Sequence, residues 1–156
     1  MSINKINKKS LKKISSGFTL LEILLVVAAI GILAGIVIFA INPAKQLGDT
    51  RNSQRKVDIN TIASAIYQYE IDTNGHPPSS ISIDPTGICK TDHDCSGLID
   101  LSVLTDSSKY LFAMPVDPQI DASDNSTGYL ISVDNDYRIV ISAPLAENGV
   151  TITITK

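Results

Sequence analysis

Ser16-Gly17-Phe18-Thr19-Leu20-Leu21-Glu22, followed by ILLVVAAIGILAGIVIFAI over residues 23–41, is the stretch that decides the fold. Within residues 18–41 one side chain is ionisable, Glu22, and nearly all the others are apolar. At about 1.5 Å of rise per residue, a helix of this length crosses a hydrocarbon core of roughly 30 Å. The sequence therefore predicts a transmembrane helix over residues 18–41.

The charges on either side of this segment predict its orientation. The first 17 residues contain no acidic residue and five lysines, at positions 5, 8, 9, 12 and 13. Because positive charge is retained on the cytoplasmic side, the N-terminus is expected in the cytoplasm and the later residues outside. Removing the lysines leaves eight Lys and Arg against sixteen Asp and Glu, a charge of −8. This acidic balance argues against nucleic acid as a direct partner.

Three interpretations compete for the apolar segment. A plain membrane anchor has no need of Glu22, because a carboxylate inside an apolar helix costs on the order of 2–3 kcal/mol in lipid. A secretory signal peptide usually has an apolar region of about 7–15 residues, and Phe39-Ala40-Ile41 is a poor cleavage site for it. The third interpretation is a prepilin N-terminus, and Glu22 favours it. The alternative for Glu22 itself is that the carboxylate lies at headgroup depth and is hydrated.

The string Ser16-Gly17-Phe18-Thr19-Leu20-Leu21-Glu22, behind its basic leader, resembles the processing site of type IV prepilins and type II secretion pseudopilins. The resemblance implies that a prepilin peptidase removes the leader, residues 1–17, by cutting after Gly17. It implies that Phe18 becomes the N-methylated first residue. It also implies that Glu22 of an incoming subunit meets the Phe18 amine of a neighbour, with Thr19 adding a hydroxyl nearby.

Gly31 and Gly35 form a small-xxx-small pattern within the apolar helix. This spacing allows the backbones of two helices to approach closely. Glycine is also frequent in membrane helices without any such role. A helix-packing function for the two residues is therefore one interpretation, and chance is the other.

A second helical pattern follows a break at Asn42-Pro43, where proline predicts a kink. Within the amphipathic helix expected over residues 45–72, apolar residues recur at Ile59, Ile62 and Ile66. Polar residues are assigned to its other faces: Arg51, Arg55, Lys56, Asp58 and Gln68. The run Asn74-Gly75-His76-Pro77-Pro78 is expected to end the helix.

Alternating patterns replace helical ones in the C-terminal half. Residues 129–133 and 137–142 flank Asp134-Asn135-Asp136 and predict a hairpin, and residues 150–155 predict a third strand. A short helix is expected within residues 98–104. These elements predict an α+β, pilin-like fold in which a long N-terminal helix, kinked near Pro43, packs on a small antiparallel sheet. The extracytoplasmic globular domain is expected over residues 42–156.

Two loops contain candidate sites. Outside the cytoplasm, Cys89 and Cys95 are expected to form a disulfide. A metal site that uses both cysteines and His93 is the alternative. A later loop is rich in oxygen ligands and, by resemblance to major pseudopilins, predicts a calcium site at Asp117, Asp121 and Asp124. Its alternative is an ordinary solvated turn.

No catalytic signature is found, and an enzyme is not expected. The sequence predicts a structural subunit of a type IV pilus or type II secretion pseudopilus. It would be placed in the cytoplasmic membrane and then in a surface or periplasmic fibre. The resemblance implies like subunits, a prepilin peptidase and an inner-membrane assembly platform as partners, and calcium as the one candidate cofactor. The alternative function is an extracytoplasmic binding domain on an uncleaved anchor.

Overall fold

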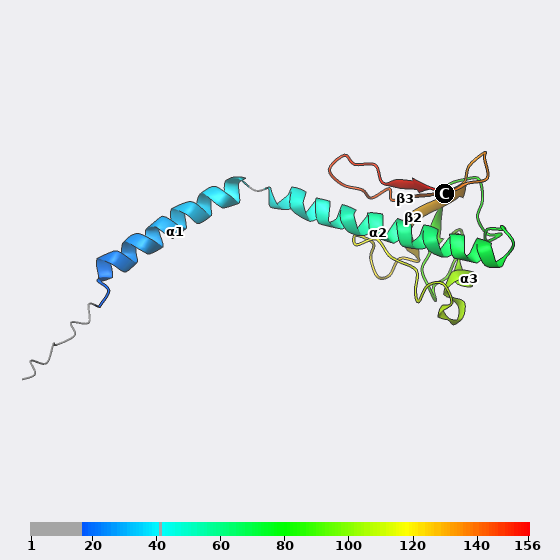
Figure 1. Cartoon of the computed structure of the whole chain (residues 1–156), viewed down its shortest axis with the longest axis horizontal. Helices are drawn as coiled ribbons and strands as arrows, with labels where there is room; N and C mark the ends of the chain where they lie inside the picture. The colour runs from blue at the N-terminus through cyan, green and yellow to red at the C-terminus, as the bar shows by residue number, and fades with distance from the viewer. Residues whose placement is uncertain (1–16, 41) are drawn as a thin grey trace, which may run out of the picture. The chain divides into compact units, whose positions relative to one another are not determined.

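A computed structural model describes residues 17–40 and 42–156, which fall into two units divided after Asn42 (Figure 1). The first unit contains helix α1 (Leu20–Ala40). The second runs from Pro43 to Lys156 and contains helix α2 (Pro43–Asp72) and all the strands. Of the expected leader and transmembrane segment, residues 1–16 and Ile41 lie outside the described residues.

Helix α1 presents an apolar surface that the rest of the described chain does not cover. Leu24 and Ile36, for example, are 62% and 61% exposed. A helix that is apolar all round belongs inside a membrane or a protein core. The span Leu20–Ile38 is long and apolar enough to cross a membrane, and none of it is buried within the structure. Lipid or other protein must therefore cover α1.

Helix α2 begins and ends where its sequence provides suitable residues. Pro43 occupies the first position, where a missing backbone N–H costs no intrahelical hydrogen bond. At the other end Gly75 has a φ of +86°, and its N–H donates to the Glu70 carbonyl at 2.7 Å. This left-handed glycine closes the helix, as the sequence predicted.

The sheet has four strands in the order β1-β2-β3-β4, with every neighbouring pair antiparallel. They are β1 (Thr86–Cys89), β2 (Ser126–Val133), β3 (Ile139–Ser142) and β4 (Thr153–Thr155). A short helix, α3 (Ser102–Thr105), and a 3-10 turn, η1 (Asp106–Ser108), lie between β1 and β2. The α+β class and the helix-on-sheet arrangement are confirmed.

The core lies between α2 and the sheet. Ile59, Ile62 and Ile66 of α2 are no more than 2% exposed, and Ile131 and Ile141 of the sheet are fully buried. Partner positions in the ladder place Ile131 beside Ile141 and Ile141 beside Ile154. The apolar face that the sequence predicted for the second helix is therefore the face that forms the core.

The strands differ from prediction at four places, the first being β2, which begins three residues before the predicted stretch, at Ser126. Strand β1 was not expected, because its four residues include Gly87 and show no clear alternation. Strand β4 is shorter than the stretch predicted from residue 150. Tyr137, expected to begin a strand, has a φ of +61° and belongs to the turn before β3.

Candidate functional site

Residues 17–19, which immediately precede α1, are exposed and have no regular secondary structure. Phe18 is 80% exposed, and α1 starts only at Leu20. Thr19 caps the helix, because its Oγ1 accepts the Glu22 backbone N–H at 3.2 Å. A threonine three residues before a glutamate is a typical helix N-terminus. The structure therefore leaves the Gly17–Phe18 bond accessible and places Glu22 in the first helical turn.

The glycines singled out in the sequence have open space where a side chain would lie. A Cβ built on Gly17, Gly31 or Gly35 would have no heavy atom within 4 Å. None of the three has the positive φ that requires glycine. If these positions need glycine, the requirement comes from another molecule.

Comparison with known proteins gives a family-model match to this region and one curated relative. The family model described as the prokaryotic N-terminal methylation motif matches residues 12–38. Over 73 residues the chain is 33% identical to type II secretion system core protein G of Aeromonas hydrophila. The chain matches the type IV pilin and pseudopilin family.

The match to the Aeromonas hydrophila protein includes only part of either chain. The match spans 47% of the chain and 50% of the relative, so the chain covers about half the length of that protein. No solved structure matches. The N-terminal helix contains the matched motif and the α+β arrangement is pilin-like, while the geometry of the globular unit has to be read from its own residues.

The most densely bonded group in the globular unit is the buried guanidinium of Arg55. Asp117 accepts two hydrogen bonds, from Nε at 2.6 Å and from Nη2 at 3.0 Å. The other three go from Nη1 to Asn52 and Glu147 and from Nη2 to Gln119. All five N–H groups of the arginine are thus used. We call these five residues the Arg55 cluster.

The sequence analysis missed this cluster. It assigned Arg55 and Asp58 to solvent-facing sides of α2, which was wrong: Arg55 is fully buried and Asp58 is 6% exposed. Asp58 accepts the Tyr129 hydroxyl hydrogen bond at 2.6 Å. One signal was present, because Arg55 precedes Ile59 by four residues and Ile62 by seven, which places it on the apolar face.

The loop between β3 and β4 is attached to the N-terminal half of α2. Asn52 and Glu147 exchange two side-chain-to-backbone hydrogen bonds, each of 2.9 Å. Asn148 donates to the Lys45 carbonyl at 3.0 Å and to Asp49 at 2.8 Å. These contacts hold the loop against helical turns that lie well before the core residues of α2.

The charges of the cluster stabilise one another. Hydrogen bonds from Arg51 and then from Arg55 lower the pKa of Glu147 from 4.5 to about 2. The pKa of Arg55 is raised, chiefly by its hydrogen bonds to Asp117 and against the effect of burial. A buried charge requires such partners. The cluster therefore has the properties of a structural centre, and nothing in it is left open for a substrate.

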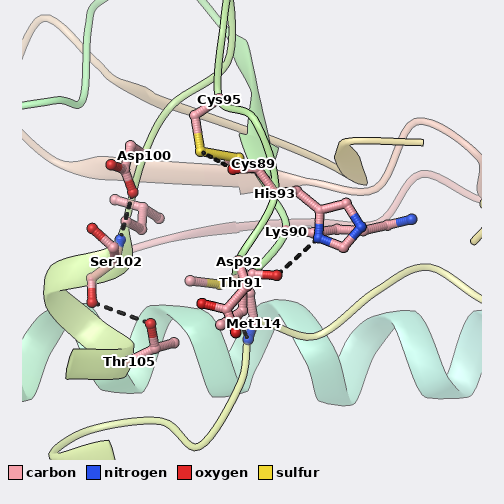
Figure 2. Close-up of a pocket in the computed structure, with 11 residues that line it drawn as sticks. Cys89, Lys90, Thr91, Asp92, His93, Cys95, Asp100, Ser102, Thr105 and Met114 are labelled. Carbon is pink, nitrogen blue, oxygen red and sulfur yellow. Dashed lines mark hydrogen bonds between the residues drawn. A yellow bond between two sulfur atoms is a disulfide. The ribbon is translucent and has the colours of Figure 1, made fainter. Parts of the chain in front are cut away.

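The two cysteines are joined in a disulfide between Cys89 and Cys95, with Cα atoms 5.4 Å apart. A disulfide leaves no thiolate for the alternative metal site, and the His93 Nδ1 lies 2.9 Å from the Thr91 carbonyl oxygen. Figure 2 shows this loop beside a small pocket of about 190 Å³. Polar and charged side chains, including Lys90, Asp100 and Ser102, line much of it.

Two of the three predicted calcium ligands, Asp117 and Asp121, have separate partners in the structure, and the third, Asp124, donates its backbone N–H to the Asp121 carbonyl at 3.2 Å. Asp117 pairs with Arg55. Asp121 accepts the Ser123 backbone N–H and hydroxyl, each at 2.9 Å, and these bonds lower its pKa. No cluster of three His, Cys, Asp or Glu suited to a metal occurs among the described residues. Calcium binding stays a prediction.

Proposed function

We propose that the chain is a structural subunit of a type IV pilus or a type II secretion pseudopilus. A prepilin peptidase would cut it between Gly17 and Phe18, and α1 would carry it into the fibre. The observation that supports this most strongly is the exposed apolar surface of α1, with one carboxylate in its first turn. The N-terminal methylation motif matches this same segment.

The assembly step follows from the chemistry of the cut. Cleavage creates an ammonium group on Phe18 at the start of an apolar helix, and methylation leaves that group charged. Inside a bundle of helices, Glu22 of one subunit neutralises the Phe18 amine of another, because two buried opposite charges are tolerated when they pair. The two charges meet at only one axial displacement of one α1 helix relative to the other. The pair therefore sets the axial register between the two subunits.

The proposed partners follow from the same steps. Like subunits cover α1 once it leaves the lipid, and an inner-membrane platform extracts it. Before assembly the subunit crosses the cytoplasmic membrane once, with its N-terminus in the cytoplasm. Afterwards it lies in a surface or periplasmic fibre. Gly31 and Gly35 would allow the α1 helices of neighbouring subunits to approach closely, because no other part of the same chain occupies the space beside them.

Mass spectrometry of the mature N-terminus tests the processing step. We expect N-methylated Phe18 in membrane and sheared-surface fractions. Gly17→Ala should block the cut, because the added methyl group would collide with the peptidase, although it meets no atom of this chain within 4 Å. Gly31→Ala, which also meets no atom of its own chain, is the matched control and should be cut normally. A retained leader in the unmodified chain would refute the proposal.

The second candidate function is a binding domain on an uncleaved anchor, supported by the membrane-length span of α1. Glu22→Ala separates the two. In a fibre subunit it should leave cleavage intact and prevent incorporation into fibres. In a simple tether it should change neither membrane insertion nor function.

A further inference from the structure

One flank of α2 carries an apolar groove at its C-terminal third. The groove has a volume of about 330 Å³, and its lining residues come from α2, β3 and the chain end: Ala63, Ile66, Tyr67, Glu70, Ile139 and Lys156. Its floor is buried, whereas the Tyr67 ring on its wall is 57% exposed. An apolar cavity of about 150 Å³ is large enough to bind benzene. The groove therefore has room for an aromatic side chain.

The opposite flank of α2 carries an exposed aromatic residue at the same level. Phe112 is 88% exposed. Its segment is attached to α2 through Tyr110, whose hydroxyl donates to Asp72 at 2.7 Å and whose ring packs edge-on against Tyr69. Residues of a helix are about 100° apart, so Tyr69 and Asp72 lie on the other side of Ile66 from Tyr67. In Figure 1 the chain end and α3 accordingly lie on opposite sides of α2.

Glu70 and Lys109, one on each flank, have opposite charges, while Lys156 also lines the groove and Asp72 accompanies Lys109. On the groove wall, burial raises the pKa of Glu70, and no salt bridge among residues 42–156 involves this carboxylate. On the other flank Lys109 bonds Asp72 at 2.7 Å, yet its side chain is 59% exposed. An ammonium group has three donors. Lys109 can therefore accept a second carboxylate as a partner.

We infer that Phe112 of one subunit inserts into the α2 groove of a second copy of this chain, with Lys109 beside Glu70 of that copy. The inference rests on the proposed fibre function and names one of its subunit contacts. Because the two surfaces differ and lie on opposite flanks, the contact is head-to-tail. Repeated contacts of this kind give an open helical polymer when they do not close into a ring.

Directed disulfide cross-linking in cells that produce the full chain tests this contact. One tagged copy carries Phe112→Cys and a second, with a different tag, carries Tyr67→Cys. Fibres from cells that produce both should contain a disulfide-linked dimer with both tags. Replacing the first change by Ser123→Cys, at an exposed position on another loop, should give no such dimer. A dimer formed by the Phe112→Cys copies alone would mean a symmetric contact and would overturn the inference.

A second variant separates this contact from assembly in general. Phe112→Ser should reduce the fibre yield at least tenfold while leaving the level of processed subunit in the membrane unchanged. Ile83→Ser, another exposed apolar position, is the control and should leave the yield unaltered. Fibres that form normally without the mixed cross-link would refute this contact and leave the proposed function standing. Absence of fibres from the unmodified chain would refute both.

Discussion

Helix α1 places Glu22 among apolar residues, and α2 buries Arg55 and Asp58 beside its apolar core residues. The two helices differ in where these charges find partners. Every N–H of Arg55 in α2 has a partner within the same chain. For the Glu22 side chain in α1, residues 17–40 and 42–156 provide no hydrogen bond or salt bridge. The globular unit therefore satisfies its buried arginine within one copy of the chain. The Glu22 carboxylate of α1 requires a partner from another molecule.

The largest effect should come from breaking the buried charge in α2. Arg55→Leu leaves Asp117 buried without its guanidinium, which should destabilise the unit by about 3–5 kcal/mol. Arg138→Leu is the control, because its salt bridge to Asp134 is solvent-exposed and worth about 0–1 kcal/mol. Urea unfolding of residues 43–156 measures both. Equal midpoints for the two variants would show that the Arg55 cluster does not hold the unit together.

An intermediate effect should distinguish the apolar surfaces of the two helices. Ile62→Ala removes a fully buried side chain and should cost about 3 kcal/mol. Ile32→Ala, whose side chain is 66% exposed on α1, should leave unfolding of the globular unit unchanged. Thermal unfolding of the full chain in detergent compares them. A lower midpoint for the α1 variant would mean that the two units depend on each other.

The smallest effect concerns pH. The pKa of Glu147 is lowered from 4.5 to about 2, so its contribution to stability is complete above pH 4.5 and is lost as the pH falls toward 2. Glu147→Gln lacks this titration. Between about pH 5 and 2.5, the unfolding midpoint should fall less in Glu147→Gln than in the unmodified unit. Parallel curves would assign the acid sensitivity to other carboxylates.

The features that the sequence predicted correctly are those determined by residues close together in the chain. The apolar run of α1, the left-handed Gly75 after α2 and the turn at residues 134–136 are each encoded by neighbouring residues. The Arg55 cluster was missed because its partners Asp117 and Glu147 lie 62 and 92 residues away. Although helical periodicity places Arg55 on the apolar face, arginine is as a residue type mostly exposed, and only the tertiary fold shows which buried carboxylates neutralise it.

The same separations govern the order in which the unit can fold. A chain made from its N-terminus presents Arg55 long before Asp117 and longer still before Glu147. Until the segments with Asp117 and Glu147 have been made, burial of the Arg55 guanidinium is unfavourable because it has no carboxylate partner. The first turns of α2 then also lack their contacts with the loop between β3 and β4. Closing such distant contacts is slow because loop-closure entropy is lost before the bonds form. The complete set of hydrogen bonds to Arg55, and with it the attachment of the first turns of α2, can therefore form only after the chain has been made as far as Glu147.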